Sequence, residues 1–419
     1  MRLNRDLSRL ESRTAAIKDE VERTARQILA DVKAEGDSAV RRYAEKFDGF
    51  TGKDTLVSEG EIKTAESNID GDFARILRRA RDRITDFHTN QIGKSWGIYK
   101  DNGVMTGQIA RPLGRVALYV PGGTAAYPST VLMNAIPAAL AGVEDLAIFT
   151  PAGRDGRIAD VILAAASCCG ISTIYKIGGA QAIAAAAYGT ETIERADKIV
   201  GPGNIYVAAA KRLVYGDVDI DMVAGPSEVL IVTDGTANPK YVAADMLSQA
   251  EHDEMARAIL VTTSEKIIED TERELERQMA YMERGEIIRR SLENNGAAIL
   301  VRDLDEAFRI SNGAAPEHLE IMTENPLEHL PKVRNAGSIF LGENTPEPLG
   351  DYMGGTNHVL PTGGTARFFS PLGVYDFVKF SSYSYYPREA LMELKDDVVK
   401  FAKSEGLHAH ANSISVRFE

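Results

Sequence analysis

Short apolar runs that alternate with helical segments fill the middle of this chain, from about residue 115 to residue 301. Residues 116–120, 229–232 and 258–261 are nearly continuous apolar runs, and sequences typical of helices follow them. Strands of this kind, without a polar face, are typical of parallel sheets that helices cover on both sides. The sequence therefore predicts an α/β fold, and the stretch is long enough for two such units.

Helices and a hairpin are predicted before this region. Across residues 14–90, apolar side chains recur at helical spacing. Residues 96–100 and 104–110 read as two strands, with Asp101-Asn102-Gly103 as the turn between them. The chain therefore enters its strand-rich region from a helical N-terminal part through a hairpin.

The C-terminal segment is predicted to hold one helix and a terminal strand. Residues 388–404 form the expected helix, and beyond it Ile414, Val416 and Phe418 alternate with polar residues. An apolar alternation at the end of a chain needs a surface to pack on. A partner subunit is one candidate for that surface.

The composition argues against several classes of protein. A length of 419 residues suggests two or three domains. The formal charge of −13 argues against binding of nucleic acid or of an anionic membrane. We find no signal peptide and no apolar tract that could span a membrane. Cys168 and Cys169 are adjacent, which disfavours a disulfide, so we expect reduced structural thiols and a cytoplasmic protein.

Gln249 and His252 form the first candidate site. They are three residues apart in a helix that Asn238 and Pro239 are predicted to begin. This spacing places both side chains on one helix face, which suits two ligands of one metal ion. The same pair also fits the end of a surface helix, so the spacing alone leaves both readings open.

Glu317 and His318 form the second candidate site, in a predicted loop after Pro316. A carboxylate beside an imidazole suits acid–base catalysis near neutral pH. Exposed Glu-His pairs without such a role are also common. The pair is therefore a hypothesis that its surroundings must decide.

Two further segments carry ionisable residues. Asp351 and His358 lie in a predicted loop with five glycines, where the backbone approaches a neighbour closely or simply turns at the surface. Glu405, His408 and His410 lie near the C-terminus, which is either part of a site or a frayed end.

The glycine turns do not make a complete dinucleotide motif. Gly201 and Gly203 are followed by Asn204, so the third glycine of the fingerprint is missing, and Gly178-Gly179 also fails the pattern. By motif alone these turns predict only helix starts that suit an anion.

Taken together, the segments resemble histidinol dehydrogenases. The resemblance spans nearly the whole chain, in the order of the family. It is carried by YVPGG (119–123), KIGGAQAIAA (176–185), KIVGPGN (198–204), MVAGPSEVLIV (222–232), LSQAEH (247–252), APEHLEI (315–321), GDYMGGTNHVLPT (350–362), SPLGVYDFVK (370–379) and EGLHAHA (405–411).

The resemblance implies oxidation of L-histidinol to L-histidine, through the aldehyde, with two molecules of NAD. It also implies one zinc ion per subunit of a homodimer. Its ligands would be Gln249, His252 and Asp351 of one subunit and His410 of the other. Nitrogen and oxygen ligands fit zinc, and the unusual glutamine ligand leaves manganese or cobalt open. The ion would hold the imidazole and amino nitrogens of the substrate.

The resemblance also implies roles for single residues. His318 would be the general base, and Glu317 would activate water for hydration of the aldehyde. Tyr119, Gln181 and Asn204 would contact NAD at an incomplete Rossmann-like unit. The expected substrate-binding residues are Ser227, Gln249, His252, Glu317, His318, Asp351, His358, Glu405 and His410.

The expected domains follow from the same comparison. Residues 1–14 would pack with the C-terminal region. Residues 15–118 and 229–372 would form a Rossmann-like domain with the metal and catalytic residues. Residues 119–228 would form a second, NAD-binding domain of this kind, and residues 373–419 would be exchanged within a dimer.

Some features depart from the family or have no role in it. In many relatives, the histidine of LSQAEH is followed by glycine and then, two residues on, by aspartate. Here Asp253-Glu254-Met255 follows this histidine. His88, His329 and His408 match no family role, and we expect them to be surface or structural residues.

Three alternatives remain at this stage. A related metal-dependent enzyme could oxidise another small alcohol, such as a sulfonated diol, although Glu405, His358 and the tail favour histidinol. An aldehyde dehydrogenase would need an activated cysteine, which the alanine-rich surroundings of Cys168 and Cys169 disfavour. A non-catalytic nucleotide-binding protein would not need Glu317 and His318.

Overall fold

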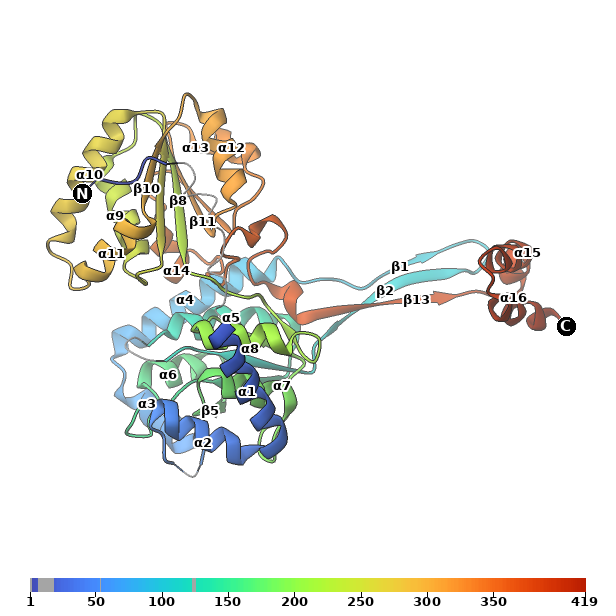
Figure 1. Ribbon diagram of the computed structural model, residues 1–419. Coiled ribbons are helices and arrows are strands. Elements are labelled where there is room, and N and C mark those ends of the chain that lie inside the picture. Colours follow the sequence, from blue (N-terminus) through green and yellow to red (C-terminus); the bar gives the residue numbers. More distant parts are fainter. Residues whose placement is uncertain (1, 7–18, 53, 123–125) are drawn as a thin grey trace. The chain divides into compact units, whose positions relative to one another are not determined.

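The computed structural model describes residues 2–6, 19–52, 54–122 and 126–419. They form two units. Unit 1 comprises Met1–Gln91 and Leu113–Phe377, and unit 2 comprises Ile92–Pro112 and Val378–Glu419. Within the described residues, unit 1 contains two five-stranded parallel sheets with helices around them, and unit 2 contains a three-stranded antiparallel sheet with two helices (Figure 1). The predicted α/β class is confirmed.

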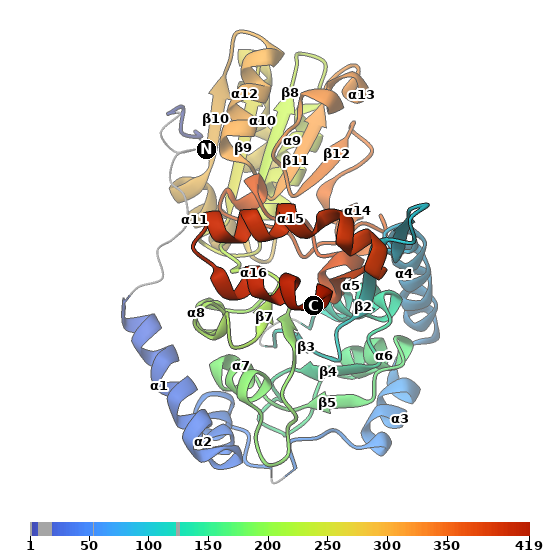
Figure 2. The same cartoon turned by 90° about the vertical axis from the view of Figure 1, so that its right-hand side faces the viewer.

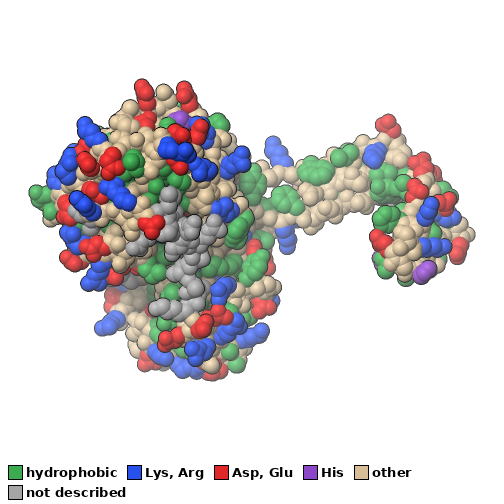
Figure 3. Space-filling model, turned by 45° about the horizontal axis from the view of Figure 1, so that its top comes forward, with side chains coloured by type: hydrophobic (Ala, Val, Ile, Leu, Met, Phe, Trp, Pro, Cys, Tyr) green, Lys and Arg blue, Asp and Glu red, His purple; other side chains and the backbone are tan. Residues whose placement is uncertain are grey.

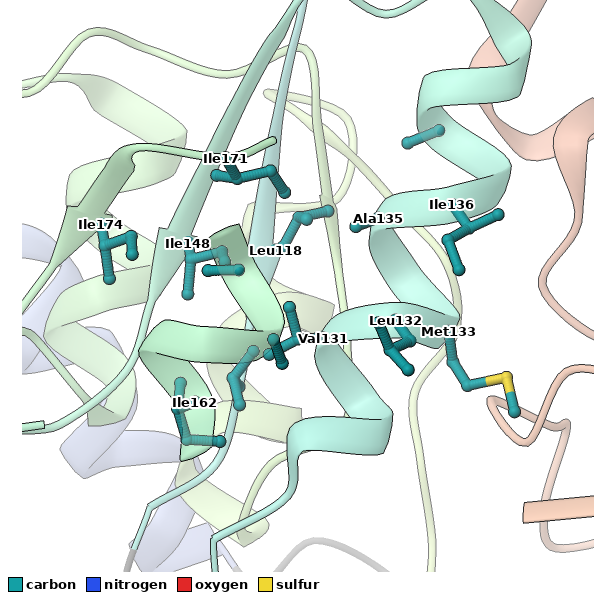
Figure 4. Close-up of a cluster of buried hydrophobic side chains, with 14 of the residues drawn as sticks. Leu118, Val131, Leu132, Met133, Ala135, Ile136, Ile148, Ile162, Ile171 and Ile174 are labelled. Atoms are coloured by element: carbon teal, nitrogen blue, oxygen red, sulfur yellow. The ribbon is translucent and has the colours of Figure 1, made fainter. Parts of the chain in front are cut away.

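The first sheet of unit 1 has the strand order β5-β4-β3-β6-β7. Its strands and the helices between them are β3 (Arg115–Tyr119), α5 (Pro128–Ala141), β4 (Asp145–Phe149), α6 (Asp160–Cys168), β5 (Thr173–Tyr175), α7 (Gly179–Tyr188), β6 (Lys198–Val200), α8 (Ile205–Val214) and β7 (Asp219–Ile220). Successive side chains point to opposite faces, so Leu118 joins one buried cluster and Tyr119 the other. Figure 4 shows the first cluster, in which Leu118 and Ile148 face Val131 of α5.

The second sheet has the order β10-β9-β8-β11-β12 and is also parallel. Its elements are β8 (Glu228–Thr233), α9 (Pro239–Ala250), β9 (Arg257–Thr262), α10 (Glu265–Met279), α11 (Gly285–Asn295), β10 (Ala297–Leu300), α12 (Leu304–Ala314), β11 (His318–Met322), α13 (Pro326–His329), β12 (Ser338–Leu341) and α14 (Glu347–Tyr352). Short 3-10 turns follow at Leu330–Lys332, Thr365–Arg367 and Val374–Phe377. Burial on both faces of β8 explains why its sequence lacks polar alternation.

The N-terminal helices pack on the first sheet. They are α1 (Asp19–Glu35), α2 (Asp37–Asp48), α3 (Glu59–Asn68) and α4 (Gly71–Thr89). α1 contacts α7 and α8, α3 contacts α6, and α4 contacts α5. This differs from the expected grouping of residues 15–118 with residues 229–372. Helical periodicity identifies the face that a helix buries, but it does not identify the sheet that covers that face.

The first described residues belong to the second sheet. Leu3 N donates to Glu272 Oε1 at 2.8 Å, and Asn4 forms a parallel bridge with Ala297 at the edge strand β10. Most of the segment 1–14, which we expected to pack with the C-terminal region, lies outside the described residues.

Unit 2 confirms the predicted hairpin. β1 (Trp96–Tyr99) pairs antiparallel with β2 (Met105–Pro112), and β13 (Val378–Tyr385) pairs with the other edge of β2. α15 (Arg388–Ser404) and α16 (His408–Ser415) then lie side by side (Figure 2).

The predicted C-terminal strand is wrong. Residues of the tail form α16 and a final 3-10 turn, Val416–Phe418. The Phe418 ring lies against the charged groups of Arg388 and Lys395 in α15. The final 3-10 turn holds the ring in this position. Three alternating apolar residues were too few to distinguish a strand from a short helix.

We find no helix long and apolar enough to cross a membrane in the part of the chain that the structure describes.

Candidate active site

His318 is the first residue of β11, directly after Glu317. The expected loop position is confirmed for Glu317, which lies in the bend before β11. It is wrong for His318, which begins an internal strand of the second sheet and is only 4 % exposed. Its Nδ1 lies 3.0 Å from the carbonyl oxygen of Glu228. A carbonyl only accepts, so Nδ1 carries the ring hydrogen and Nε2 presents a lone pair. Burial lowers the pKa of His318, which favours this neutral form.

Glu317 is held by the same neighbour. Its Oε2 accepts a hydrogen bond from Glu228 N at 2.9 Å and lies 3.7 Å from His318 Nδ1. Burial raises the pKa of Glu317 well above its usual range, which favours the protonated carboxyl. This burial excludes the alternative of an exposed Glu-His pair.

Gln249 lies in the last turn of α9 and is completely buried. Neither its Oε1 nor its Nε2 has a hydrogen-bond partner among the described residues. A buried amide without partners is costly, so this side chain is suited to a ligand that the protein itself does not provide. The carboxamide oxygen can serve a metal ion in this way.

His252 and Asp351 are brought together, although almost a hundred residues separate them. Each offers one ligand atom in a group that also includes Glu347, and these atoms all lie within 4.8 Å of one another. Asp351 was expected in a loop but lies in α14, one turn after Glu347. Two carboxylates and an imidazole at this separation are a donor set that suits a divalent cation, and Gln249 lies three residues before His252 in the chain.

Glu347 is the residue of this cluster that the sequence analysis missed. It is buried, its Oε2 accepts from Ser248 Oγ at 3.3 Å, and its Oε1 lies 3.9 Å from His318 Nε2. The only local signal is the spacing of four residues from Asp351. Burial and the neighbouring Glu347 carboxylate raise the pKa of Asp351 above its usual range.

His358 faces the same group. Its Nδ1 lies 3.8 Å from Asp351 Oδ1, and its Nε2 lies 3.5 Å from Thr130 Oγ1 of α5. Burial lowers the pKa of His358 to about 4. Ser227 immediately precedes β8, next to the Glu228 backbone that holds Glu317. Within unit 1, the residues expected to bind substrate and metal therefore gather around the amino ends of β8 and β11, apart from the residues expected to bind NAD.

Glu405 and His410 belong to unit 2. Glu405 follows α15, His410 lies in α16, and both side chains are exposed. Their expected roles in substrate and metal binding therefore stay predictions.

The residues expected at NAD line one large cavity in unit 1. The cavity has a volume of about 1450 Å³, and Tyr119, Gln181 and Asn204 all line it. It lies at the carboxyl ends of β3 and β4, where ligands of such sheets usually bind. Tyr119 Oη accepts from Gly179 N at 3.0 Å, and Asn204 caps α8.

Two details of this cavity favour a polar ligand. Gln181 is completely buried, and its Oε1 has no hydrogen-bond partner within the residues that the structure describes. Asp48, which the sequence analysis missed, also lines the cavity, and burial raises its pKa to about 6. Asp48 is distant in sequence from the glycine turns, so no motif indicated it.

The cysteines and the remaining histidines lie apart from this chemistry. Cys168 and Cys169 are free, and burial raises the pKa of Cys169 to about 12, opposite to what a nucleophilic thiolate needs. His88, His329 and His408 were expected to be surface or structural residues. His88 is completely buried and hydrogen-bonded, so it is a structural residue. His329 is half-buried, and His408 is exposed.

Comparison with known proteins gives one consistent result. A family model described as histidinol dehydrogenase matches residues 11–418. The chain is 60% identical over 413 residues to the histidinol dehydrogenase of Lactococcus lactis, covering 98% of this chain and 96% of the relative. It is 54% identical over 400 residues to that of Clostridium acetobutylicum, covering 96% and 93%. The crystal structure of histidinol dehydrogenase from Elizabethkingia anophelis matches with a TM-score of 0.94 and 39% identity, over 99% of this chain and 96% of that one.

Proposed function

Because the chain belongs to the histidinol dehydrogenase family, we propose that it oxidises L-histidinol to L-histidine through L-histidinal, with two molecules of NAD, in histidine biosynthesis. The observation that carries this proposal is the geometry around His318. The distance from His318 Nε2 to Glu347 Oε1 is 3.9 Å. Glu347 in turn belongs to the donor group that also contains His252 and Asp351. A buried base beside a cluster of metal donors suits the oxidation of a bound alcohol.

The proton chemistry follows from the two catalytic side chains. In the first oxidation, His318 Nε2 takes the hydroxyl proton while the carbinol hydrogen leaves as hydride to NAD. His318 then returns this proton to the aldehyde oxygen, while Glu317 takes a proton from water and the water oxygen adds to the aldehyde carbon. In the second oxidation, His318 takes a hydroxyl proton of the hydrate, and the second hydride leaves to a second NAD. Two hydrides are transferred in total, which balances the four-electron change from alcohol to carboxylate.

The metal site would be formed by Gln249, His252 and Asp351 with His410 of the partner subunit. The buried, unpartnered amide of Gln249 and the grouped donor atoms of His252 and Asp351 support this set. A zinc ion bound there would hold the imidazole and amino nitrogens of the substrate and so orient its hydroxyl group. Ser227, His358 and Glu405 would complete the substrate site.

NAD would bind in the cavity at the carboxyl ends of the first sheet. Its volume of about 1450 Å³ and the unpartnered Oε1 of Gln181 support this assignment. Tyr119 and Asn204 would contribute further contacts. Asp48 lines the same cavity and adds a carboxylate that can accept hydrogen bonds from a polar ligand.

A homodimer is supported by the surface of unit 2. Apolar side chains are exposed on its sheet and helices, as Figure 3 shows for one face of the molecule. They include Trp96, Ile98, Tyr99, Phe380, Tyr385, Met392, Val398, Phe401 and Leu407. Such a concentration of exposed apolar groups indicates a surface that another protein covers. A second copy of the chain would cover it and receive residues 373–419, and the dimer would work in the cytoplasm.

An assay of NADH formation tests the proposed function. Purified protein is incubated with NAD and L-histidinol, in parallel with other amino alcohols and small diols, with and without a chelator. We expect turnover of L-histidinol with a yield of two NADH per substrate, and loss of turnover with the chelator that zinc restores. No NADH from L-histidinol, together with turnover of a sulfonated diol, would instead support the alternative within the same architecture.

A further inference from the structure

Asn357 lies directly before His358 and is almost completely buried, at 4 % exposure. Its Oδ1 accepts a hydrogen bond from Val359 N at 2.9 Å, so the side chain closes a turn around His358. Its Nδ2 donates to the carbonyl oxygen of Met133, in α5, at 2.8 Å. The Asn357 side chain therefore bonds both to the backbone of Val359, the residue after His358, and to the backbone of α5.

His88 supports Asn357 from the other side. It lies near the end of α4, is completely buried, and its Nε2 lies 3.4 Å from Asn357 Nδ2. Its Nδ1 lies 2.8 Å from Gln91 Oε1, which also accepts from Val374 N at 3.0 Å. The backbone N–H of Val374 identifies this Gln91 atom as an acceptor. His88 Nδ1 therefore carries the hydrogen, and its Nε2 accepts from Asn357.

The same two helices also contact the neighbourhood of His358. Thr130, which lies 3.5 Å from His358 Nε2, is in α5, one turn before Met133. Gly355 has a φ of +90°, and a Cβ at this position would lie 2.8 Å from the carbonyl oxygen of Arg83 in α4. Glycine allows both this φ and this close approach. The segment before His358 is thus fixed against α4 and α5 by backbone contacts as well.

We propose that Asn357 and His88 are positioning residues for His358. They connect the turn that carries His358 to α5 and α4 and hold its imidazole opposite Asp351. The donors His88 Nδ1, Asn357 Nδ2 and Val359 N each have an acceptor, so these bonds are consistent with one set of proton positions. The importance of His358 for the substrate rests on the proposed function, whereas the geometric part of the inference does not.

Hydrogen–deuterium exchange of the purified full-length protein tests the geometric part without substrate. Asn357→Ala removes the acceptor of Val359 N–H, and we expect this amide to exchange about 10-fold faster. Asn357→Asp keeps that acceptor but loses the donor to Met133, so the Val359 amide should stay protected. Asn134→Ala is the matched control. Like Asn357, Asn134 is a buried asparagine, but it lies in α5 and donates to Thr130 O rather than bonding to Val359. Unchanged Val359 exchange in Asn357→Ala, or an equal increase in the control, would overturn the inference.

Steady-state kinetics test the consequence for catalysis. We expect Asn357→Ala to raise the KM for L-histidinol about 10-fold with a smaller change in kcat, and the Asn134 control to change neither beyond its effect on stability. His88→Leu should act in the same direction as Asn357→Ala, while His88→Gln, which keeps a donor and an acceptor, should recover part of the loss. Faster exchange of Val359 with an unchanged KM would refute a positioning role. An inactive wild-type protein would refute the proposed function and leave the exchange result standing.

Discussion

At the scale of single residues, the backbone of Glu228 bonds to both side chains of the proposed catalytic pair, Glu317 and His318. Its N–H donates to Glu317, and its carbonyl oxygen accepts from His318. This is possible because β11 pairs in parallel with β8, with His318 opposite Val229. Strand pairing thus places His318 Nδ1 against a carbonyl oxygen, which leaves the Nε2 lone pair for the proposed role as general base.

Replacement of His252 tests the metal site. His252→Ala removes one of the grouped donors, so we expect the purified protein to lose bound zinc and, with it, NADH formation from L-histidinol. Zinc content is measured by elemental analysis of the dialysed protein. His329→Ala serves as the control, because His329 lies outside the donor group. Zinc content equal to that of the wild type would contradict the assignment of His252 as a ligand.

Replacement of His318 separates the base from the metal. In His318→Ala the donor group stays intact, so zinc content should be normal, while kcat should fall by about 10² or more, as is usual when a general base is lost. The measurements are stopped-flow or steady-state NADH formation and elemental analysis of the same preparation. A kcat like that of the wild type would remove His318 from the mechanism.

At the scale of elements, the end of α9 positions Gln249 and His252, two of the proposed metal ligands. Asn238 caps the helix by accepting from Lys240 N at 3.1 Å, and Pro239 occupies the first turn, as the sequence predicted. Gln249 lies in the last turn, and the helix ends at Ala250, so His252 lies just beyond it. This helix end therefore carries Gln249 and His252, and the ligand atom of His252 lies within 4.8 Å of those of Glu347 and Asp351 in α14.

Loss of the helix cap should destabilise this arrangement modestly. Asn238→Ala leaves the N–H of Lys240 without its side-chain acceptor, and we expect a loss of about 1 kcal/mol in the free energy of unfolding. Chemical denaturation followed by circular dichroism measures this change. Asn238→Asp, which keeps the acceptor, should remain close to the wild type. Equal stability of Asn238→Ala and the wild type would show that the cap does not contribute.

At the scale of the whole molecule, the proposed metal- and substrate-binding residues are divided between the two units. Gln249, His252 and Asp351 belong to unit 1, whereas Glu405 and His410 belong to unit 2. Unit 2 exposes many apolar side chains on a small sheet and two helices. This division supports an enzyme whose sites are shared between subunits.

Mixing of inactive subunits tests the sharing. A chain that lacks residues 405–419 should be inactive, because it provides neither Glu405 nor His410 to its partner. Co-expression with His252→Ala subunits should restore part of the activity, since a heterodimer would contain one site with all its donors. Tagged heterodimers are isolated and assayed for NADH formation. Absence of rescue in verified heterodimers would count against shared sites.

The sequence by itself determined the α/β class, the hairpin, and the cap and start of α9, since these features depend on apolar periodicity and on hydrogen bonds between near neighbours in the chain. Family resemblance, rather than spacing, gave the roles of Gln249, His318 and Asp351. Only the tertiary structure decided that Glu317 and His318 are buried, that Glu347 joins His252 and Asp351, and that Asp48 lines the cavity. The tertiary structure also shows that α1 and α3 pack on the helices of the first sheet. It shows a helix where a terminal strand was predicted. These outcomes depend on which segments, distant in the sequence, pack together. A local sequence pattern does not identify the segment against which it will pack.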